Sequence, residues 1–317
     1  MTGIIIDSTW GLGDNITSLH ARNSKVLSAY LNFPLIGSKE VPKELEKKYD
    51  VVIFVHASAY TNVSEFAKLI ELNKDSKYFY VKNEYNLGEP VILWGACRDH
   101  GIKFSVIANH SNEANMKKFD KYTTGIWHNI NLNTLIYGNF YKPSTNSLSS
   151  FLKKKTDKKR IVYYGACRRN REKYFKKYSK AVIFSTSDRN REFFNTVCPN
   201  ANFINRLNWH SSGITLANFD ASLYIEDEHT HDHYNFLANR FYESLNFNVP
   251  CFFDKSTEKS LELSGYPINK WYIVDSPEEL QDKINTKTWE DYGFEQLNKI
   301  AREEKQTVLE SVFKIIS

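Results

Sequence analysis

An arginine and a glutamate three residues apart, Arg240 and Glu243, have the chemistry to hold a nucleotide. Their spacing would place them side by side on one helix face. A guanidinium can form two parallel hydrogen bonds to a diphosphate, and a carboxylate can accept hydrogen bonds from both ribose hydroxyls. The alternative is a surface ion pair, which contributes little to stability.

Apolar segments on both sides of this pair are typical of strands in an open α/β sheet. Residues 221–225 and 249–253 are short apolar runs, and the charged stretch 226–233 between them is predicted to be a polar loop outside the core. Apolar residues that repeat every four positions predict a helix over residues 234–247. Open α/β sheets bind ligands at the carboxyl ends of their strands, which favours the nucleotide interpretation.

A second candidate for diphosphate binding follows a strand predicted at residues 160–164. Gly165 begins a turn, and three arginines follow within four residues. Crowding cations on one turn is costly unless an anion neutralises them, so we predict that Arg168 and Arg171 contact the diphosphate. Phe184 ends the next predicted strand and could stack on a nucleobase.

The first half of the chain offers two candidate general bases. A strand at residues 3–7 runs into a glycine-rich turn with Gly13 and Asp14, a layout that brings backbone N–H groups close to a phosphate or sugar. This turn resembles the first loop of heptosyltransferases, in which an aspartate serves as base. Glu84 follows a strand predicted at residues 77–81, where a carboxylate would face the crevice of the sheet. The alternatives are an ordinary tight turn and a solvated loop glutamate.

Length and composition predict two domains with substantial cores. The chain has 317 residues, of which 41% are hydrophobic, and a formal net charge of +5 that permits a polyanionic partner without demanding one. Its apolar runs are too short to span a bilayer, and we expect no signal peptide and no membrane partner. Four cysteines without metal-ligand spacing favour a reduced, cytoplasmic protein.

The polar, serine- and lysine-rich stretch at residues 144–159 is the predicted domain boundary. It divides the chain into an N-terminal domain, 1–152, and a C-terminal domain, 153–317. The lysines of this stretch could alternatively contact a phosphate backbone. An amphipathic helix over residues 295–316 ends the chain, and we expect it to pack back on the first domain.

Several segments in the same order resemble the GT-B glycosyltransferases, and most of all the DNA β-glucosyltransferases of T-even phages. Residues 161–171 resemble the strand, glycine and arginines of the family's donor loop, and residues 221–254 resemble its loop, Arg-x-x-Glu helix and strand ending in aspartate. Residues 271–282 match a later aromatic stretch. Glu84 falls where the family has its catalytic aspartate, and Asp14 stands where the family has asparagine.

The resemblance implies a GT-B fold, with two Rossmann-like domains facing each other across a central cleft: an N-terminal acceptor-binding domain, 1–152, and a C-terminal nucleotide-sugar-binding domain, 153–317. It implies a hexosyltransferase that moves a sugar, glucose in the family, from a UDP-sugar to a hydroxymethylated pyrimidine of double-stranded phage DNA, with the base flipped out of the duplex. Glu84, or Asp14 as its rival, would deprotonate the acceptor hydroxyl. The residues assigned to the donor are Gly13, Gly165, Arg168, Arg171, Phe184 near uracil, Arg240 and Glu243.

Three alternatives stay open. The same donor site would serve a GT-B enzyme that acts on a surface glycan or small molecule, or a non-catalytic sugar-nucleotide sensor. The alternating histidines at residues 229–233 could bind Zn²⁺ or Mn²⁺, although we favour a solvated or phosphate-side loop. We expect a monomer without a tightly bound cofactor or dedicated metal site, and a requirement for Mg²⁺ or Mn²⁺ is left open.

Overall fold

The fold consists of two compact units, each built around a parallel sheet. The computed structural model divides the chain into Met1–Ile136 with Glu304–Ser317 (unit 1) and Tyr137–Glu303 (unit 2). The boundary expected at 152/153 falls in a stretch outside the described residues. The structure describes residues 1–7, 9–10, 19–44, 46–55, 63–83, 97–109, 126–138, 160–165, 169–186, 188–207, 215–226, 236–286 and 291–317.

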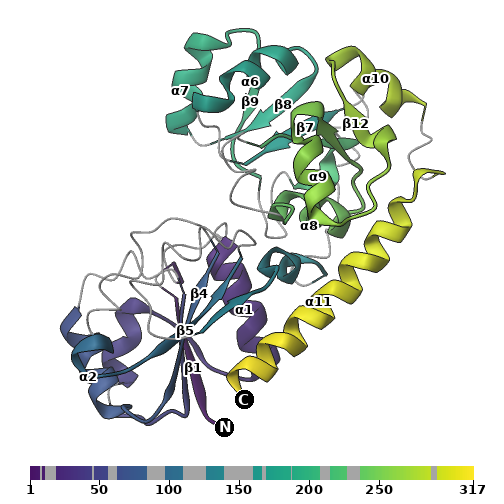
Figure 1. Cartoon of the computed structure of the whole chain (residues 1–317). Coiled ribbons are helices and arrows are strands. Elements are labelled where there is room, and N and C mark those ends of the chain that lie inside the picture. Colours follow the sequence, from purple (N-terminus) through teal and green to yellow (C-terminus); the bar gives the residue numbers. More distant parts are fainter. Residues whose placement is uncertain are drawn as a thin grey trace. The chain divides into compact units, whose positions relative to one another are not determined.

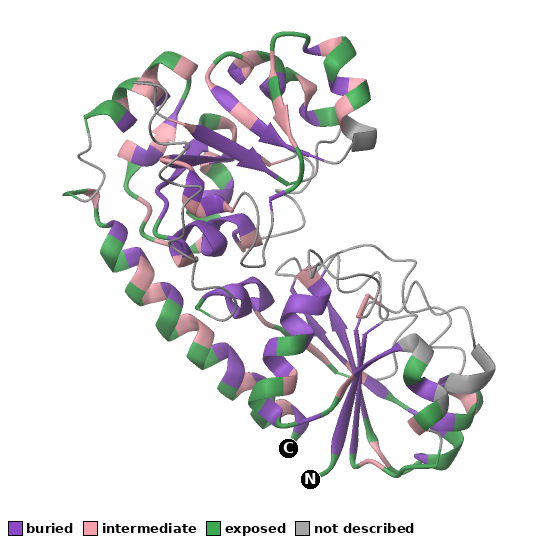
Figure 2. Ribbon diagram, turned by 180° about the vertical axis from the view of Figure 1, so that it is seen from behind, coloured by how far each residue is buried: buried purple, intermediate pink, exposed green. Residues whose placement is uncertain are grey.

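Unit 1 contains a six-stranded parallel sheet in the order β2-β1-β3-β4-β5-β6 (Figure 1). In the centre of the sheet, Ile5 of β1 pairs with Ile53 of β3, which pairs with Phe79 of β4. Every residue of β1 and β3 is buried (Figure 2), as their uninterrupted apolar runs require when both faces are covered. The strands are β1 (Gly3–Asp7), β2 (Leu35–Gly37), β3 (Val51–Val55), β4 (Lys77–Lys82), β5 (Phe104–Ala108) and β6 (Trp127–Asn129).

Helices cover both faces of this sheet. Helix α1 (Leu19–Leu31) connects β1 to β2, and α2 (Val63–Leu72) connects β3 to β4 in the opposite direction along the sheet. Because such crossovers are right-handed, the two helices lie on opposite faces (Figure 1). The last turns of the C-terminal helix α11 (Phe294–Ile316) also belong to unit 1, where Glu304 accepts a hydrogen bond from Asn131 at 2.7 Å.

Unit 2 contains a second six-stranded parallel sheet, in the order β12-β11-β10-β7-β8-β9. The chain winds outward from β7 in one direction and then returns to β10 on its other side, which is the order of doubly wound dinucleotide-binding folds. The switch point therefore lies between the carboxyl ends of β7 and β10. The strands are β7 (Ile161–Tyr164), β8 (Val182–Ser185), β9 (Asn202–Ile204), β10 (Ala221–Tyr224), β11 (Cys251–Asp254) and β12 (Ile273–Val274).

The core of unit 2 is rich in aromatic rings from its strands and helices. Phe175 packs edge-on against Phe184 and Phe194, with ring centroids 5.0 and 4.7 Å away. Such contacts add to the free energy of burying the rings. The helices of the unit are α6 (Glu172–Tyr178), α7 (Asp188–Val197), α8 (Asn239–Asn246), α9 (Glu258–Ser264), α10 (Pro277–Asn285) and the first part of α11.

Helix α8 begins later than its apolar periodicity predicts. The repeat predicts a start at residue 234, but Ala238 is still extended, with ψ 159°, and the helix begins at Asn239. The hydroxyl of Tyr224 accepts a hydrogen bond from the Ala238 N–H at 2.8 Å. A tertiary contact therefore sets the start of this helix, which local periodicity cannot reveal.

Within the described part of the chain, no helix combines the length and apolar character needed to cross a bilayer.

Candidate functional site

Cationic side chains meet at the switch point of unit 2. Gly165 directly follows β7, and Arg171 belongs to the short 3-10 turn Arg169–Arg171 that leads into α6. Arg240 lies in the first turn of α8, and Glu226 follows β10. The fold therefore unites three of the residues predicted to bind the diphosphate with one that was not singled out.

Gly165 leaves room for the guanidinium of Arg240. Its φ of +142° is disfavoured for residues with a side chain. A Cβ atom at Gly165 would lie 2.8 Å from Nη1 of Arg240 and 3.4 Å from the hydroxyl of Tyr163. The glycine thus permits both the backbone turn and the close approach of the arginine.

Arg240 is held in a buried, aromatic environment. It is 8% exposed, and its guanidinium carbon lies 5.0 Å from the ring centroid of Tyr224. Nη2 donates to the carbonyl of Ile225 at 2.9 Å and to the carboxylate of Glu226. Burial opposes the charged guanidinium, but attraction to Glu226 outweighs it and raises the pKa of Arg240. Arg240 is therefore a permanent buried cation.

Arg171 shares the same carboxylate. It is 3% exposed, donates through Nη1 to the hydroxyl of Tyr163, and through Nη2 to Glu226 at 3.1 Å. The Glu226 side chain is only 12% exposed. Glu226, the first residue of the stretch predicted to lie outside the core, is thus partly buried because two buried cations hold its carboxylate, and residues 227–233 lie outside the described residues.

Buried hydroxyl groups fix α8 against the sheet. Tyr164 of β7 donates to the carbonyl of Arg240 at 2.7 Å, and the Ser222 and Ser244 hydroxyls lie 2.7 Å apart. Burial raises the pKa of the nearby Cys251 thiol to about 11, which makes it a poor nucleophile. These contacts lock the helix turn that carries Arg240.

Glu243 lies one turn beyond Arg240 on α8, as the spacing predicts. Its carboxylate accepts a hydrogen bond from Asn239 at 3.0 Å and is 1% exposed. The carboxylate and burial together raise the pKa of Tyr164, with burial the larger cause. Its contact with a ribose stays a prediction.

The assignment of Phe184 to the uracil site is wrong. The ring is completely buried and lies within 6.0 Å, centroid to centroid, of Tyr163 and Phe175. A ring without exposed surface cannot stack on a nucleobase. Phe184 is a core residue of β8.

Several predicted site residues lie outside the described residues: Gly13, Asp14, Glu84, Arg168 and the histidines of residues 229–233. Among the described residues, no group of three or more histidine, cysteine, aspartate or glutamate side chains is arranged to hold a metal ion. The alternatives that involve a metal therefore stay open.

The residue before Glu84, Asn83, directly follows the carboxyl end of β4. Asn83 is 3% exposed, and its Oδ1 accepts a hydrogen bond from Asn23 of α1 at 2.9 Å. Its Nδ2 then donates to Nδ1 of His20 at 3.0 Å, so a neutral His20 carries its proton on Nε2. The sequence analysis did not single out this polar cluster, which lies at the carboxyl end of β4 in the sheet of unit 1.

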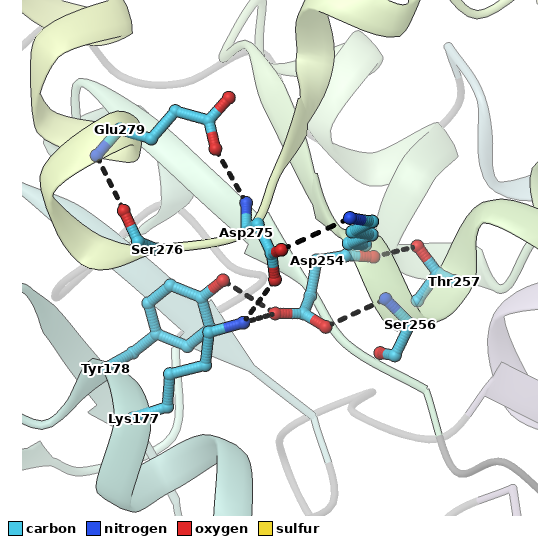
Figure 3. A network of polar contacts seen from close by, with 9 residues as sticks. Lys177, Tyr178, Asp254, Ser256, Thr257, Asp275, Ser276 and Glu279 are labelled. Carbon is cyan, nitrogen blue, oxygen red and sulfur yellow. Dashed lines mark hydrogen bonds and ion pairs between the residues drawn. The ribbon is translucent and has the colours of Figure 1, made fainter.

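Asp254, which ends β11 and matches the family pattern, has a structural role (Figure 3). Its carboxylate accepts hydrogen bonds from Lys177 at 2.9 Å, Tyr178 at 2.6 Å and the Ser256 N–H at 3.0 Å. Burial opposes ionisation, but these hydrogen bonds outweigh it and lower the pKa of Asp254. The carboxylate ties α6 to the end of β11.

We expect Asp254→Asn to lower the free energy of unfolding by about 1–3 kcal/mol at pH 7. Because the folded-state pKa lies below the unfolded value, this stabilisation is present above about pH 4 and is lost as the pH falls through the folded pKa. Denaturant titrations at a series of pH values should show the two proteins converge in acid. Asp275→Asn, which removes exposed ion pairs with Lys177 and Lys255, should change little. If the free energies of unfolding of wild type and Asp254→Asn still differ in acid, the structural role of the Asp254 carboxylate is contradicted.

We expect Gly165→Ala to weaken UDP binding about ten-fold, because the new methyl group displaces the guanidinium of Arg240. Gly265→Ala is the matched control. Gly265 also has a positive φ, +72°, but no atom of the described residues lies within 4 Å of its Cβ position. Both variants should lose stability through backbone strain, whereas calorimetry with UDP should separate them. Equal UDP affinities would show that Arg240 does not bind the diphosphate.

Comparison with solved structures identifies the fold as that of GT-B glycosyltransferases. A variant of T4 phage β-glucosyltransferase with UDP-glucose is 16% identical, with a TM-score of 0.64 and 100% of both chains covered. The DNA modifying enzyme β-glucosyltransferase is 18% identical, with a TM-score of 0.63 and 100% of both chains covered. Anabaena HepE in complex with UDP is 13% identical, with a TM-score of 0.56, and the match covers 100% of this chain and 99% of HepE.

These similarities establish the fold. The predicted class, GT-B with two Rossmann-like domains, is confirmed by the two sheets and these structures. No protein-family model and no curated protein matches the sequence. At such low identity, activity must be argued from the site itself.

Proposed function

We propose that this chain is a UDP-sugar-dependent glycosyltransferase that acts on hydroxymethylated pyrimidine bases of double-stranded DNA, with glucose as the favoured sugar. The observation that carries the proposal is the meeting of Arg171, Arg240 and Gly165 at the switch point of unit 2. This is where doubly wound folds bind nucleotides. The similar T4 phage and Anabaena structures contain UDP-glucose and UDP.

In this proposal, the chain's residues divide the chemistry between donor and acceptor. Arg171, Arg240 and Arg168 bind the diphosphate and neutralise the charge that develops on departing UDP, while Glu243 accepts hydrogen bonds from the ribose. Glu84 takes the proton of the acceptor hydroxyl, whose oxygen bonds to the anomeric carbon as the bond to UDP breaks. Asp14 is the rival base.

The DNA acceptor is supported by the similarity to a DNA modifying enzyme and is compatible with the net charge of +5. The target base would have to leave the duplex to reach the site. The enzyme would act as a cytoplasmic monomer without a tightly bound cofactor. Duplex binding that weakens steeply with salt distinguishes this proposal from a GT-B enzyme with a glycan or small-molecule acceptor.

UDP should raise the melting temperature of the protein far more than uridine does. A ligand that binds only the folded state stabilises it more the further its concentration exceeds its Kd, and the diphosphate supplies the charge that the two buried arginines bind. Thermal unfolding with equal concentrations of each ligand provides the measurement. Equal shifts would mean that Arg171 and Arg240 are structural and that the donor site lies elsewhere.

A further inference from the structure

The carboxylate of Glu226 joins the two arginines of the proposed donor site. One oxygen accepts a hydrogen bond from Nη2 of Arg240, and the other accepts one from Nη2 of Arg171 at 3.1 Å. The two guanidiniums are 9% and 3% exposed, and the carboxylate is 12% exposed. A single negative charge is thus shared by two buried positive charges.

This cluster has the capacity to bind more negative charge than Glu226 supplies. Nε of Arg240 is buried and has no hydrogen-bond acceptor among the described residues. Arg240 also lies in the first turn of α8, where the N-cap residue Ala238 has no capping side chain and no acidic residue is present. The amino end of a helix favours anions. A ligand with more charge and more oxygens than a carboxylate would satisfy the cluster better.

We propose that Glu226 is the specificity-determining residue of the donor site, because its carboxylate and the donor's diphosphate compete for the same two guanidiniums. The inference rests on the proposed function. A diphosphate diester carries two negative charges where Glu226 carries one, and its extra oxygens can also reach Nε of Arg240. An uncharged nucleoside cannot displace the carboxylate.

Because of this competition, only a ligand with more negative charge than the Glu226 carboxylate gains free energy from the two arginines. When the diphosphate binds, Glu226 leaves the arginines and its carboxylate becomes hydrated. The free energy of breaking both ion pairs is subtracted from the affinity of every phosphate-bearing ligand. Uridine avoids this cost because it leaves the ion pairs intact, but it gains nothing from the arginines.

The experiment is calorimetric titration of wild type and Glu226→Gln with UDP and with uridine. Glutamine keeps the size of the side chain but removes the competing charge. We expect the Kd for UDP to fall about ten-fold or more, because the two arginines no longer have to give up a carboxylate. The Kd for uridine should not change. Glu172→Gln removes an ion pair with Lys176 at the start of α6, and it should leave both affinities unchanged.

A second variant keeps the test decisive if the loss of charge impairs folding. Glu226→Asp retains the charge, but its carboxylate is one methylene too short to bridge both arginines, so UDP affinity should still rise by several-fold. Unchanged or weaker UDP binding in the variants would overturn the inference and make Glu226 a structural or ligand-binding residue. If wild type binds UDP no better than uridine, the proposed donor site itself is wrong, which is a different outcome.

Discussion

Glu84→Gln should reduce the rate of sugar transfer by about 100- to 10,000-fold, which is the usual contribution of a positioned general base. Glutamine retains the size and the hydrogen bonding of glutamate but cannot accept the proton. The affinity for UDP should barely change, because the donor arginines belong to the other unit. Steady-state kinetics with a saturating UDP-sugar, together with calorimetry, would separate the two effects.

Glu84 itself lies outside the described residues, whereas Asn83, which precedes it in the sequence, hydrogen-bonds to Asn23 and His20 of α1 at the carboxyl end of β4. Asp14→Asn is the matched variant, since Asp14 is the rival base. If Asp14→Asn abolishes turnover while Glu84→Gln remains active, the assignment is wrong and the glycine-rich turn supplies the base.

Arg240→Ala should weaken UDP binding by about ten- to hundred-fold, the equivalent of a lost charge-assisted hydrogen bond of about 1.5–3 kcal/mol. The arginine is buried, so its removal should also lower the melting temperature. The titration must therefore be run well below the midpoint of unfolding. Circular dichroism at the same temperature would confirm that the variant is folded.

Arg169→Ala is the control for this prediction. Arg169 belongs to the same arginine-rich turn as Arg171, but it is exposed and its guanidinium lies over the Phe193 ring at 4.5 Å. Its removal should leave UDP affinity within about two-fold, because an exposed cation–π contact contributes little. If Arg169→Ala and Arg240→Ala lose UDP affinity to a similar extent, the cause is a general effect of positive charge rather than a defined diphosphate site.

The central strands could be predicted from the sequence because they are uninterrupted apolar runs between polar residues. β1 has the predicted bounds, and β4 extends one residue further. The three-residue strands β2 and β9 were not predicted, since a short edge strand has too few apolar residues to form a pattern. The start of α8 depends on Tyr224, fourteen residues before Ala238, and such a contact leaves no local signal.

In the candidate site too, residues with a local sequence signal could be predicted, whereas residues defined by contacts distant in the sequence could not. Arg171 and Arg240 could be proposed from the sequence because their side chains suit a diphosphate, and Gly165 because it directly follows a predicted strand. Glu226 could not, because its partners are 14 and 55 residues away in the sequence. The error at Phe184 has a related cause: an aromatic residue at a strand end is compatible with both a ligand surface and the core, and only tertiary packing decides between them.

Mass spectrometry of hydroxymethylated duplex DNA after incubation with the protein and UDP-glucose tests the central claim most directly. The account predicts that the modified nucleoside gains the mass of one hexose, and that Arg240→Ala lowers the yield sharply. Unmodified cytosine and thymine in the same duplex should not change. If the protein binds UDP-glucose but the DNA mass stays the same with this donor and with a panel of other UDP-sugars, the assignment of DNA as the acceptor is contradicted.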